Sequence, residues 1–160
     1  MNKIERRILP AGTMTNRTID GIAVPYNSLS VVLRDRPRPY RERMEPRAMK
    51  IDDSVSMFIQ HEPGSVPLGR TGAGTLRFDE RAEGLGFACD LPECRKDVIE
   101  ALERGDFDGS VSVGFIVSEG GDTWKHNRGG PSIRTVRNAR LVEVSLVTSG
   151  AYGSAKSRLV

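Results

Sequence analysis

Short runs of alternating apolar and polar residues dominate the chain, and clusters of Gly, Pro, Asn and Asp separate them. A period of two is typical of β-strands that bury one face. The even spacing of the runs favours a barrel or a sandwich over alternating strand–helix units. Nine strands are predicted, near Ile4–Leu9, Thr18–Val24, Tyr40–Met44, Ser56–His61, Thr75–Phe78, Gly84–Leu91, Ser110–Val117, Ile133–Asn138 and Leu141–Thr148.

One helix is predicted among these strands, and a weaker helical pattern covers Pro46–Asp52. For the first helix, Asp90 is the expected N-cap, with Glu93 in the reciprocal position of a capping box. Gly105 can end this helix in a left-handed conformation. Its apolar stripe consists of Cys94, Val98, Ala101 and Leu102. The pattern as a whole predicts a mostly-β domain with one or two packed helices.

The length of 160 residues fits a single domain over residues 1–160. Hydrophobic residues make up 38% and charged residues 28%, a balance typical of globular domains. No apolar run approaches the roughly 20 residues that span a bilayer, and the charged first ten residues do not resemble a signal peptide. We therefore expect a cytoplasmic protein without a membrane partner, and a disordered tail over residues 153–160.

The net charge of +3 comes largely from one segment, Arg34–Arg43, which reads RDRPRPYRER. Proline interrupts regular structure and like charges repel, so a mobile, solvated basic loop is expected. The alternative is a contact surface for an acidic partner or for nucleic acid. Zinc-finger spacing, aromatic-rich strand motifs and long basic helices are all missing, so we predict no nucleic-acid partner.

The sequence has two cysteines, Cys89 and Cys94. A lone pair at this spacing indicates neither a disulfide framework nor a zinc site. We expect both to be small buried apolar groups. No cofactor and no metal ion is predicted.

A serine hydroxyl becomes a useful nucleophile when a base takes its proton, and imidazole suits that task near neutral pH. The chain has two histidines. His61 follows the apolar run 57–60 and precedes a Glu-Pro-Gly turn, so it lies where a strand meets a loop, a favoured position for a site. His126 lies in 122–131, a polar, Gly-rich stretch that looks like an exposed hairpin connection. Either histidine can also be a purely structural or surface residue.

The segment 109–115, with the sequence GSVSVGF, alternates strictly. Its Val and Phe residues share one face, which should enter the core, and Ser110, Ser112 and Gly114 share the other, which should stay open. Gly114 leaves room beside Ser112 for another backbone to approach. Strand parity does not distinguish Ser110 from Ser112.

The β-prone run 141–148 carries one carboxylate, Glu143. Val142, Val144 and Leu146 should form an apolar face, with Glu143 and Ser145 on the opposite face. A buried carboxylate needs a partner. An imidazolium would serve, and so would an arginine such as Arg140 or Arg134, which the residues alone favour.

Together these segments resemble, in order along the chain, the prohead protease family of tailed bacteriophages, which is related to the herpesvirus assemblins. The resemblance covers about Thr18 to Tyr152. Four blocks carry most of it: 45–49 (EPRAM, where "pGAF" is usual), 61–70 (HEP followed by PLGR), 111–115 (VSVGF, where "M-S-x-G-F" is usual) and 141–147 (LVEVSLV). The chain departs from the family where GAY at 150–152 replaces "P-A-Y" and in stopping at Val160, while relatives often carry a further tail.

The resemblance implies a serine endopeptidase in which Ser112 is the nucleophile, His61 its base and Glu143 the third, orienting group. It also implies a small closed β-barrel of the herpesvirus-protease type. The substrate would be scaffold or the scaffold-like arm of the major capsid protein, and the chain itself. The expected place of action is the host cytoplasm and the interior of the assembling prohead, and because assemblins need dimerisation, a homodimer is expected.

Two other functions remain open at this stage. A catalytically silent capsid-assembly protein could keep the protease fold and would tolerate loss of Ser112. A binding module that uses the Arg34–Arg43 loop would instead lose its function with the charge of that loop.

Overall fold

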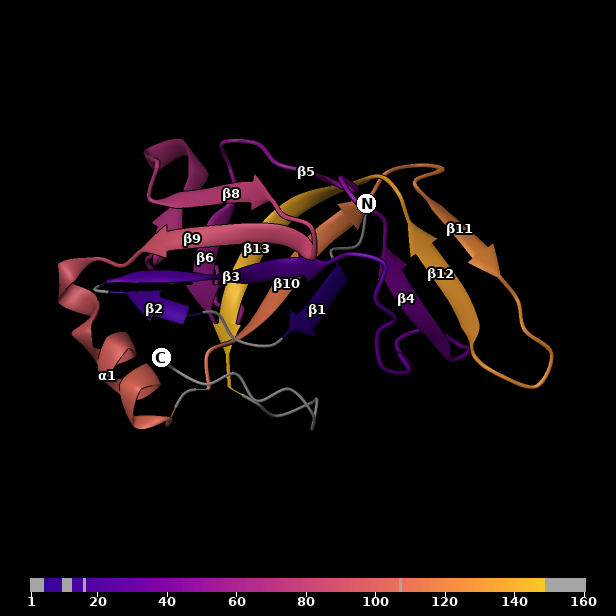
Figure 1. Cartoon of the computed structure of the whole chain (residues 1–160), viewed down its shortest axis with the longest axis horizontal. Coiled ribbons are helices and arrows are strands. Elements are labelled where there is room, and N and C mark those ends of the chain that lie inside the picture. Colours follow the sequence, from indigo (N-terminus) through magenta and orange to yellow (C-terminus); the bar gives the residue numbers. More distant parts are fainter. Residues whose placement is uncertain (1–4, 10–12, 16, 107, 149–160) are drawn as a thin grey trace.

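The computed structural model describes residues 5–9, 13–15, 17–106 and 108–148. Strands make up 47% of the described residues and helix 11%, so this part of the protein is mostly β, as predicted. All nine predicted strands are found, and four short ones join them. The described strands form three sheets (Figure 1). No helix among the described residues has the length and apolar character needed to cross a membrane.

The largest sheet has the order β1-β10-β13-β6-β7, with β5 also paired to β13. Strand β13 pairs antiparallel with β10 on one side and parallel with β6 on the other. It is therefore a central strand, and segments far apart in the sequence meet on it. The bounds are β1 (Glu5–Leu9), β5 (Met49–Lys50), β6 (Ser56–Ile59), β7 (Gly69–Arg70), β10 (Ser110–Val117) and β13 (Ala139–Val147).

A four-stranded sheet, ordered β2-β3-β9-β8, lies in front of the first in the view of Figure 1. The core fills the space between them, with Phe87 and Cys89 of the second sheet and Val113, Phe115 and Leu146 of the first fully or almost fully buried. The bounds are β2 (Thr13–Thr15), β3 (Thr18–Pro25), β8 (Leu76–Glu80) and β9 (Gly84–Asp90).

The third sheet has three strands in the order β11-β12-β4, and it forms one end of the molecule in Figure 1. Its centre is an ion-pair network in which the buried Arg134 contacts Glu42 at 3.0 Å and Asp122 at 2.6 Å. The bounds are β4 (Tyr40–Met44), β11 (Asp122–Lys125) and β12 (Ser132–Val136). Strand β4 contains part of the segment expected to be a basic loop, and residues 34–39 connect into it. The expected tail, 153–160, lies outside the described residues.

The predicted helix is α1 (Lys96–Arg104), which packs Val98 and Leu102 into the core and ends at Gly105 with φ of 74°. The capping prediction was wrong, because Asp90 is the last residue of β9 and its carboxylate accepts hydrogen bonds from Thr18 and Arg77. The second predicted helix was also wrong. Its segment contains Arg47 in a left-handed conformation (φ 61°) and then β5, which pairs with β13.

The closed barrel predicted from the resemblance is not found, since the described strands form three separate sheets. At the seam between the first two sheets, Gly69 of β7 packs against Cys89, where a Cβ on the glycine would lie 2.5 Å from Sγ. Strand β7 has two residues and pairs with β6. The sheets are therefore joined here by packing, without a strand ladder that would close a barrel.

The prediction that both cysteines are buried holds for Cys89 and fails for Cys94. Burial raises the pKa of the Cys89 thiol to about 12, so this group stays protonated and inert. Cys94 is exposed because it lies in the turn of 3₁₀ helix that precedes α1, outside the buried stripe.

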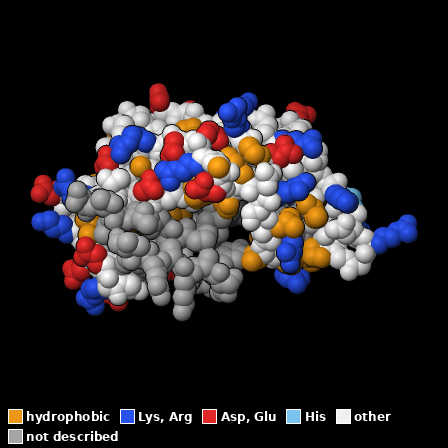
Figure 2. All heavy atoms as spheres, in the orientation of Figure 1, with side chains coloured by type: hydrophobic (Ala, Val, Ile, Leu, Met, Phe, Trp, Pro, Cys, Tyr) orange, Lys and Arg blue, Asp and Glu red, His pale blue; other side chains and the backbone are white. Residues whose placement is uncertain are grey.

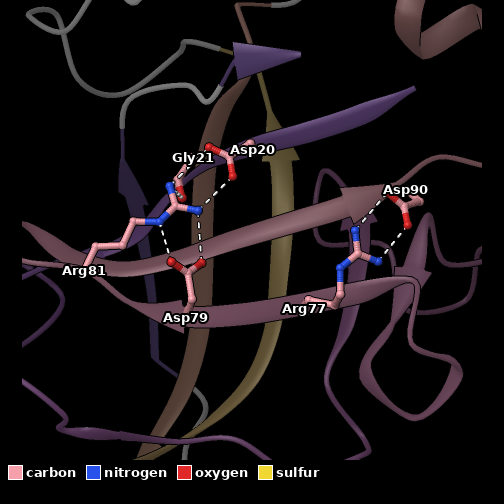
Figure 3. Close-up of polar contacts among 6 residues, drawn as sticks. All are labelled: Asp20, Gly21, Arg77, Asp79, Arg81 and Asp90. Carbon is pink, nitrogen blue, oxygen red and sulfur yellow. Dashed lines mark hydrogen bonds and ion pairs between the residues drawn. The ribbon is translucent and has the colours of Figure 1, made fainter. Parts of the chain in front are cut away.

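Ion pairs cross the outer face of the second sheet (Figure 3). Arg81 bridges Asp20 and Asp79 at 2.8 and 2.7 Å, and Arg77 contacts Asp90 at 2.6 Å. Gly86 makes the first bridge possible, because a Cβ there would lie 2.2 Å from Arg81 Nε.

The hydrogen bond from Arg77, supported by Thr18, lowers the pKa of Asp90 to about 2. In the unfolded chain the carboxyl titrates near 4, so this contribution to stability is complete above about pH 4 and is lost as the pH falls towards 2. We expect Arg77→Gln to flatten the loss of stability in that range, measured as the urea midpoint against pH. Arg70→Gln, which removes an exposed arginine elsewhere, is the control and should keep the wild-type slope. Equal slopes in the two variants would contradict this prediction.

Candidate active site

The turn after β6 carries His61, and the end of β13 holds this turn in place. The amide of Gln60 donates to the carbonyl of Leu146 at 2.8 Å, and the Gln60 side chain donates to Thr148 Oγ1 at 2.8 Å. Both Gln60 (φ 52°) and His61 (φ 58°) adopt the left-handed conformation, which costs roughly 1–2 kcal/mol for each non-glycine residue. Strain of this kind persists where the surrounding contacts determine the geometry, and it is concentrated at functional sites.

The turn brings the His61 ring to Glu143 on β13. His61 Nδ1 and Glu143 Oε1 are 3.0 Å apart, and Glu143 is 4% exposed. An ionised carboxylate can only accept hydrogen bonds, so this contact places a proton on Nδ1 and leaves the lone pair of Nε2 free to accept another. Ser145, which is fully buried, donates to the second oxygen, Oε2, at 3.4 Å.

The strand register places Ser112 on the same face of the sheet. Ser112 of β10 lies directly opposite Ser145, and Gly114 lies directly opposite Glu143. Ser112 and Glu143 are therefore diagonal neighbours, whose Cβ atoms are typically about 7–8 Å apart in an antiparallel pair. Ser110 is one step further along, opposite Val147, and its amide is bonded to Asp108.

The Ser112 hydroxyl is fully buried and has no hydrogen-bond partner among the described residues. Leaving a buried hydroxyl unpaired costs about 1–3 kcal/mol, so a native structure keeps one for a reason. A catalytic role is such a reason, because the hydrogen bonds of a catalytic hydroxyl are often long or poorly aligned until substrate binds.

Comparison with known proteins gives one result. A family model described as caudovirus prohead serine protease matches residues 2–160. The chain belongs to this family. No curated protein and no solved structure gives a significant match. The match supports a serine protease of the capsid-maturation type.

In this prohead protease family member, the described structure brings His61 and Glu143 into contact and puts Ser112 on the same face of one sheet. His126 lies elsewhere, on the third sheet, where its Nδ1 contacts Ser132 Oγ at 3.0 Å. Within the described ranges, no three His, Cys, Asp or Glu side chains gather so that they could hold a metal ion.

Three expectations about this region need correction. The serine face of β10 was expected to stay open and is buried, with Ser110 8% exposed and Ser112 fully buried. The two arginines favoured as partners of Glu143 contact other carboxylates: Arg134 pairs with Glu42 and Asp122, and Arg140 lies 4.0 Å from Asp52. The stretch 122–131 contains a strand, β11, in addition to a connection.

The prediction that Val142, Val144 and Leu146 share one apolar face of β13 is wrong for Val142, because the strand register shifts there. Gly114 pairs with Glu143, but Phe115 pairs with Leu141, so Val142 is an extra residue in the ladder. Leu141 is fully buried as a result and Val142 is only partly buried. Such bulges are common beside active sites because they re-aim a side chain.

Gly114 is the neighbour that gives the carboxylate its room. A Cβ added at this glycine would lie 2.6 Å from Glu143 Cγ and 2.9 Å from Oε1. Space for another backbone was predicted beside Gly114, and that space holds the Glu143 side chain. Gln60 and Ser145 were missed as supporting residues, although the alternation of 141–147 already placed Ser145 beside Glu143.

We expect Gly114→Ala to displace the Glu143 side chain and break its contact with His61. Activity on a protein substrate should fall at least about 10²-fold, since sub-ångström misplacement in a site of this kind carries penalties of that order. Gly64→Ala, at a turn glycine with open space around it, is the matched control and should keep its activity. Full activity in Gly114→Ala would show that the position of Glu143 is unimportant.

Proposed function

We propose that this chain is an endopeptidase that cleaves scaffold or the scaffold-like arm of the major capsid protein, and itself, inside the assembling prohead. Ser112 is the nucleophile, His61 the base and Glu143 the orienting acid. The observation that carries the proposal is the contact of His61 Nδ1 with the buried Glu143, on the sheet face that also holds an unpaired serine hydroxyl. The family match supports the same reaction class.

The proposed reaction has two halves. Nε2 of His61 takes the proton of Ser112 Oγ while the oxygen attacks the scissile carbonyl carbon. The tetrahedral intermediate collapses as the C–N bond breaks, and His61 returns the proton to the leaving amine. Water then attacks the acyl-enzyme as His61 accepts its proton, and His61 returns that proton to Ser112 Oγ as the ester bond breaks. Glu143 stabilises the imidazolium that forms in each half.

The burial of Ser112 has a consequence for the substrate. A scissile bond can reach the hydroxyl only when the segments that cover it give way, so substrate binding and access are coupled. A folded protein surface is a poor substrate for such a site, and an extended arm is a better one. This geometry supports a scaffold-like arm as the substrate.

Ser112→Ala should abolish cleavage of a capsid-protein substrate co-expressed with the enzyme, with products measured by mass. Ser110→Ala should retain most activity, because Ser110 lies one step further from the His61–Glu143 pair. Among the histidines, His61→Ala should share the loss and His126→Ala should not. Ser112→Ala should also be as stable as the wild type or slightly more stable, because an unpaired buried hydroxyl is removed.

An active Ser112→Ala variant would overturn the serine mechanism. If no variant and no wild-type preparation cleaves the substrate, but prohead assembly still requires the chain, the silent assembly protein becomes the better explanation.

Glu143→Gln separates a catalytic from a structural role for the carboxylate. The variant keeps the shape of the side chain and loses the charge that stabilises imidazolium. Loss of the orienting carboxylate in a comparable triad costs on the order of 10⁴ in turnover, so we expect a loss of at least about 10²-fold. The thermal midpoint should change little, since a buried charge has been neutralised.

Turnover and thermal midpoint are measured on the same Glu143→Gln preparation. If the charge serves structure alone, breaking its ion pairing should cost roughly 3–5 kcal/mol of stability while activity per folded molecule survives. That result would remove Glu143 from the catalytic machinery.

A further inference from the structure

A pocket of about 440 Å³ opens at one end of the third sheet, away from the candidate active site. Its walls are the segment 32–39, which leads into β4, and the connection 126–132 between β11 and β12. Neither wall contributes to the His61–Glu143 contact. The residues that matter for its chemistry are Val32, Arg34, Arg38, His126, Pro131 and Ser132.

The pocket presents positive charge that the described structure does not neutralise. Arg34 and Arg38 are exposed, and neither guanidinium has a hydrogen-bond or ion-pair partner among the described residues. The acid between them, Asp35, accepts a hydrogen bond from the Tyr40 hydroxyl at 2.8 Å. Two planar guanidinium groups facing one pocket are well suited to bidentate contacts with carboxylates.

Backbone and side-chain hydrogen bonds hold the walls in place. Leu33 and Tyr40 exchange two backbone hydrogen bonds, at 2.7 and 3.1 Å, and the amide of Ser132 donates to the carbonyl of Pro39 at 3.3 Å. His126 contacts Ser132 at 3.0 Å on the opposite wall. The pocket is therefore preformed, and a ligand need not order it.

Apolar side chains line the pocket beside the two arginines. This combination favours a polypeptide over a nucleic acid as the partner. Val32, Pro39 and Pro131 line the pocket together with the two arginines. Figure 2 shows hydrophobic and Lys or Arg side chains side by side over this part of the molecule. Nucleic-acid surfaces need a basic track with stacking platforms, whereas a mixed cationic and apolar pocket matches a peptide that alternates acidic and apolar residues.

We propose that this pocket binds an acidic segment of a partner polypeptide, whose carboxylates pair with Arg34 and Arg38 and whose apolar side chains pack on Val32 and Pro131. The proposal is independent of catalysis, because none of these residues belongs to the candidate active site. It assigns a use to the basic segment that cleavage chemistry does not require.

The test uses Trp124, the single tryptophan of the sequence, as a reporter. Its ring stacks on His126 with centroids 6.5 Å apart, and the Arg36 guanidinium lies 5.5 Å from its centroid, so it borders the pocket. Full-length Ser112→Ala protein, which cannot degrade a peptide by the proposed route, is titrated with a short peptide of alternating Glu and Leu. Tryptophan fluorescence is followed at low and at high salt.

We expect saturable binding that weakens with salt, because exposed charges are screened. Arg34→Gln/Arg38→Gln should weaken it at least about tenfold, the effect of losing a charge-assisted contact. The control variant Lys50→Gln/Arg70→Gln removes the same charge from exposed residues elsewhere and should bind within about twofold of the parent. A matched peptide with Gln in place of Glu should not bind.

Three results would overturn the proposal. The first is no binding of the acidic peptide. The second is equal loss of binding in both double variants, which would show a general charge effect. The third is tight binding of a single-stranded oligonucleotide with none of the peptide, which would assign the pocket to nucleic acid. Circular dichroism confirms that each variant is folded, which is expected because the substituted side chains are exposed.

Discussion

The pairing of β13 with two different partners is the constraint on which the rest of the structure depends. On one side it pairs antiparallel with β10, and on the other parallel with β6. The first pairing sets Glu143 beside Gly114 and one diagonal step from Ser112. The second pairing continues in the hydrogen bond from the Gln60 amide to the Leu146 carbonyl. It places the turn that contains His61 next to the same carboxylate. Because the period of a strand is two, a slip of one residue in either pairing would move these side chains to the opposite face.

Much of the fold follows from local pattern, because strand alternation and turn residues are properties of short segments. The strand at Ser110–Val117 and the end of α1 at Gly105 depend on such signals, and both are found where predicted. Features that depend on distant partners were not predictable. The two-residue β5 forms because it pairs with β13. Asp90 does not cap the helix because its carboxylate accepts hydrogen bonds from Thr18 and Arg77.

The same division applies to the candidate site. Parity grouped Ser110, Ser112 and Gly114 on one face of their strand and Glu143 with Ser145 on one face of theirs, and both groupings are found. Parity did not reveal the extra residue at Val142, because a bulge is a property of the ladder and not of one strand. The contact between His61 and Glu143 spans 82 residues, and nothing local predicts it in preference to an arginine.

The candidate site concentrates features that stability alone would disfavour. It holds a buried carboxylate, a buried hydroxyl without a described partner and two consecutive left-handed residues. A core built for stability would replace each with an apolar or relaxed alternative. Their occurrence together, around one sheet face and the turn beside it, is what local rules do not explain and what the proposed chemical role would explain.

The order in which the chain supplies these groups adds a temporal constraint. During synthesis the imidazole emerges first, the hydroxyl next and the carboxylate last, on the final described strand. Because β13 lies between β6 and β10, these two strands cannot be joined in one sheet until β13 has left the ribosome. A nascent chain therefore keeps His61 and Ser112 on separate strands or turns, and both come together with Glu143 only when translation has passed β13. The fold itself delays the meeting of these three side chains until β13 has been made.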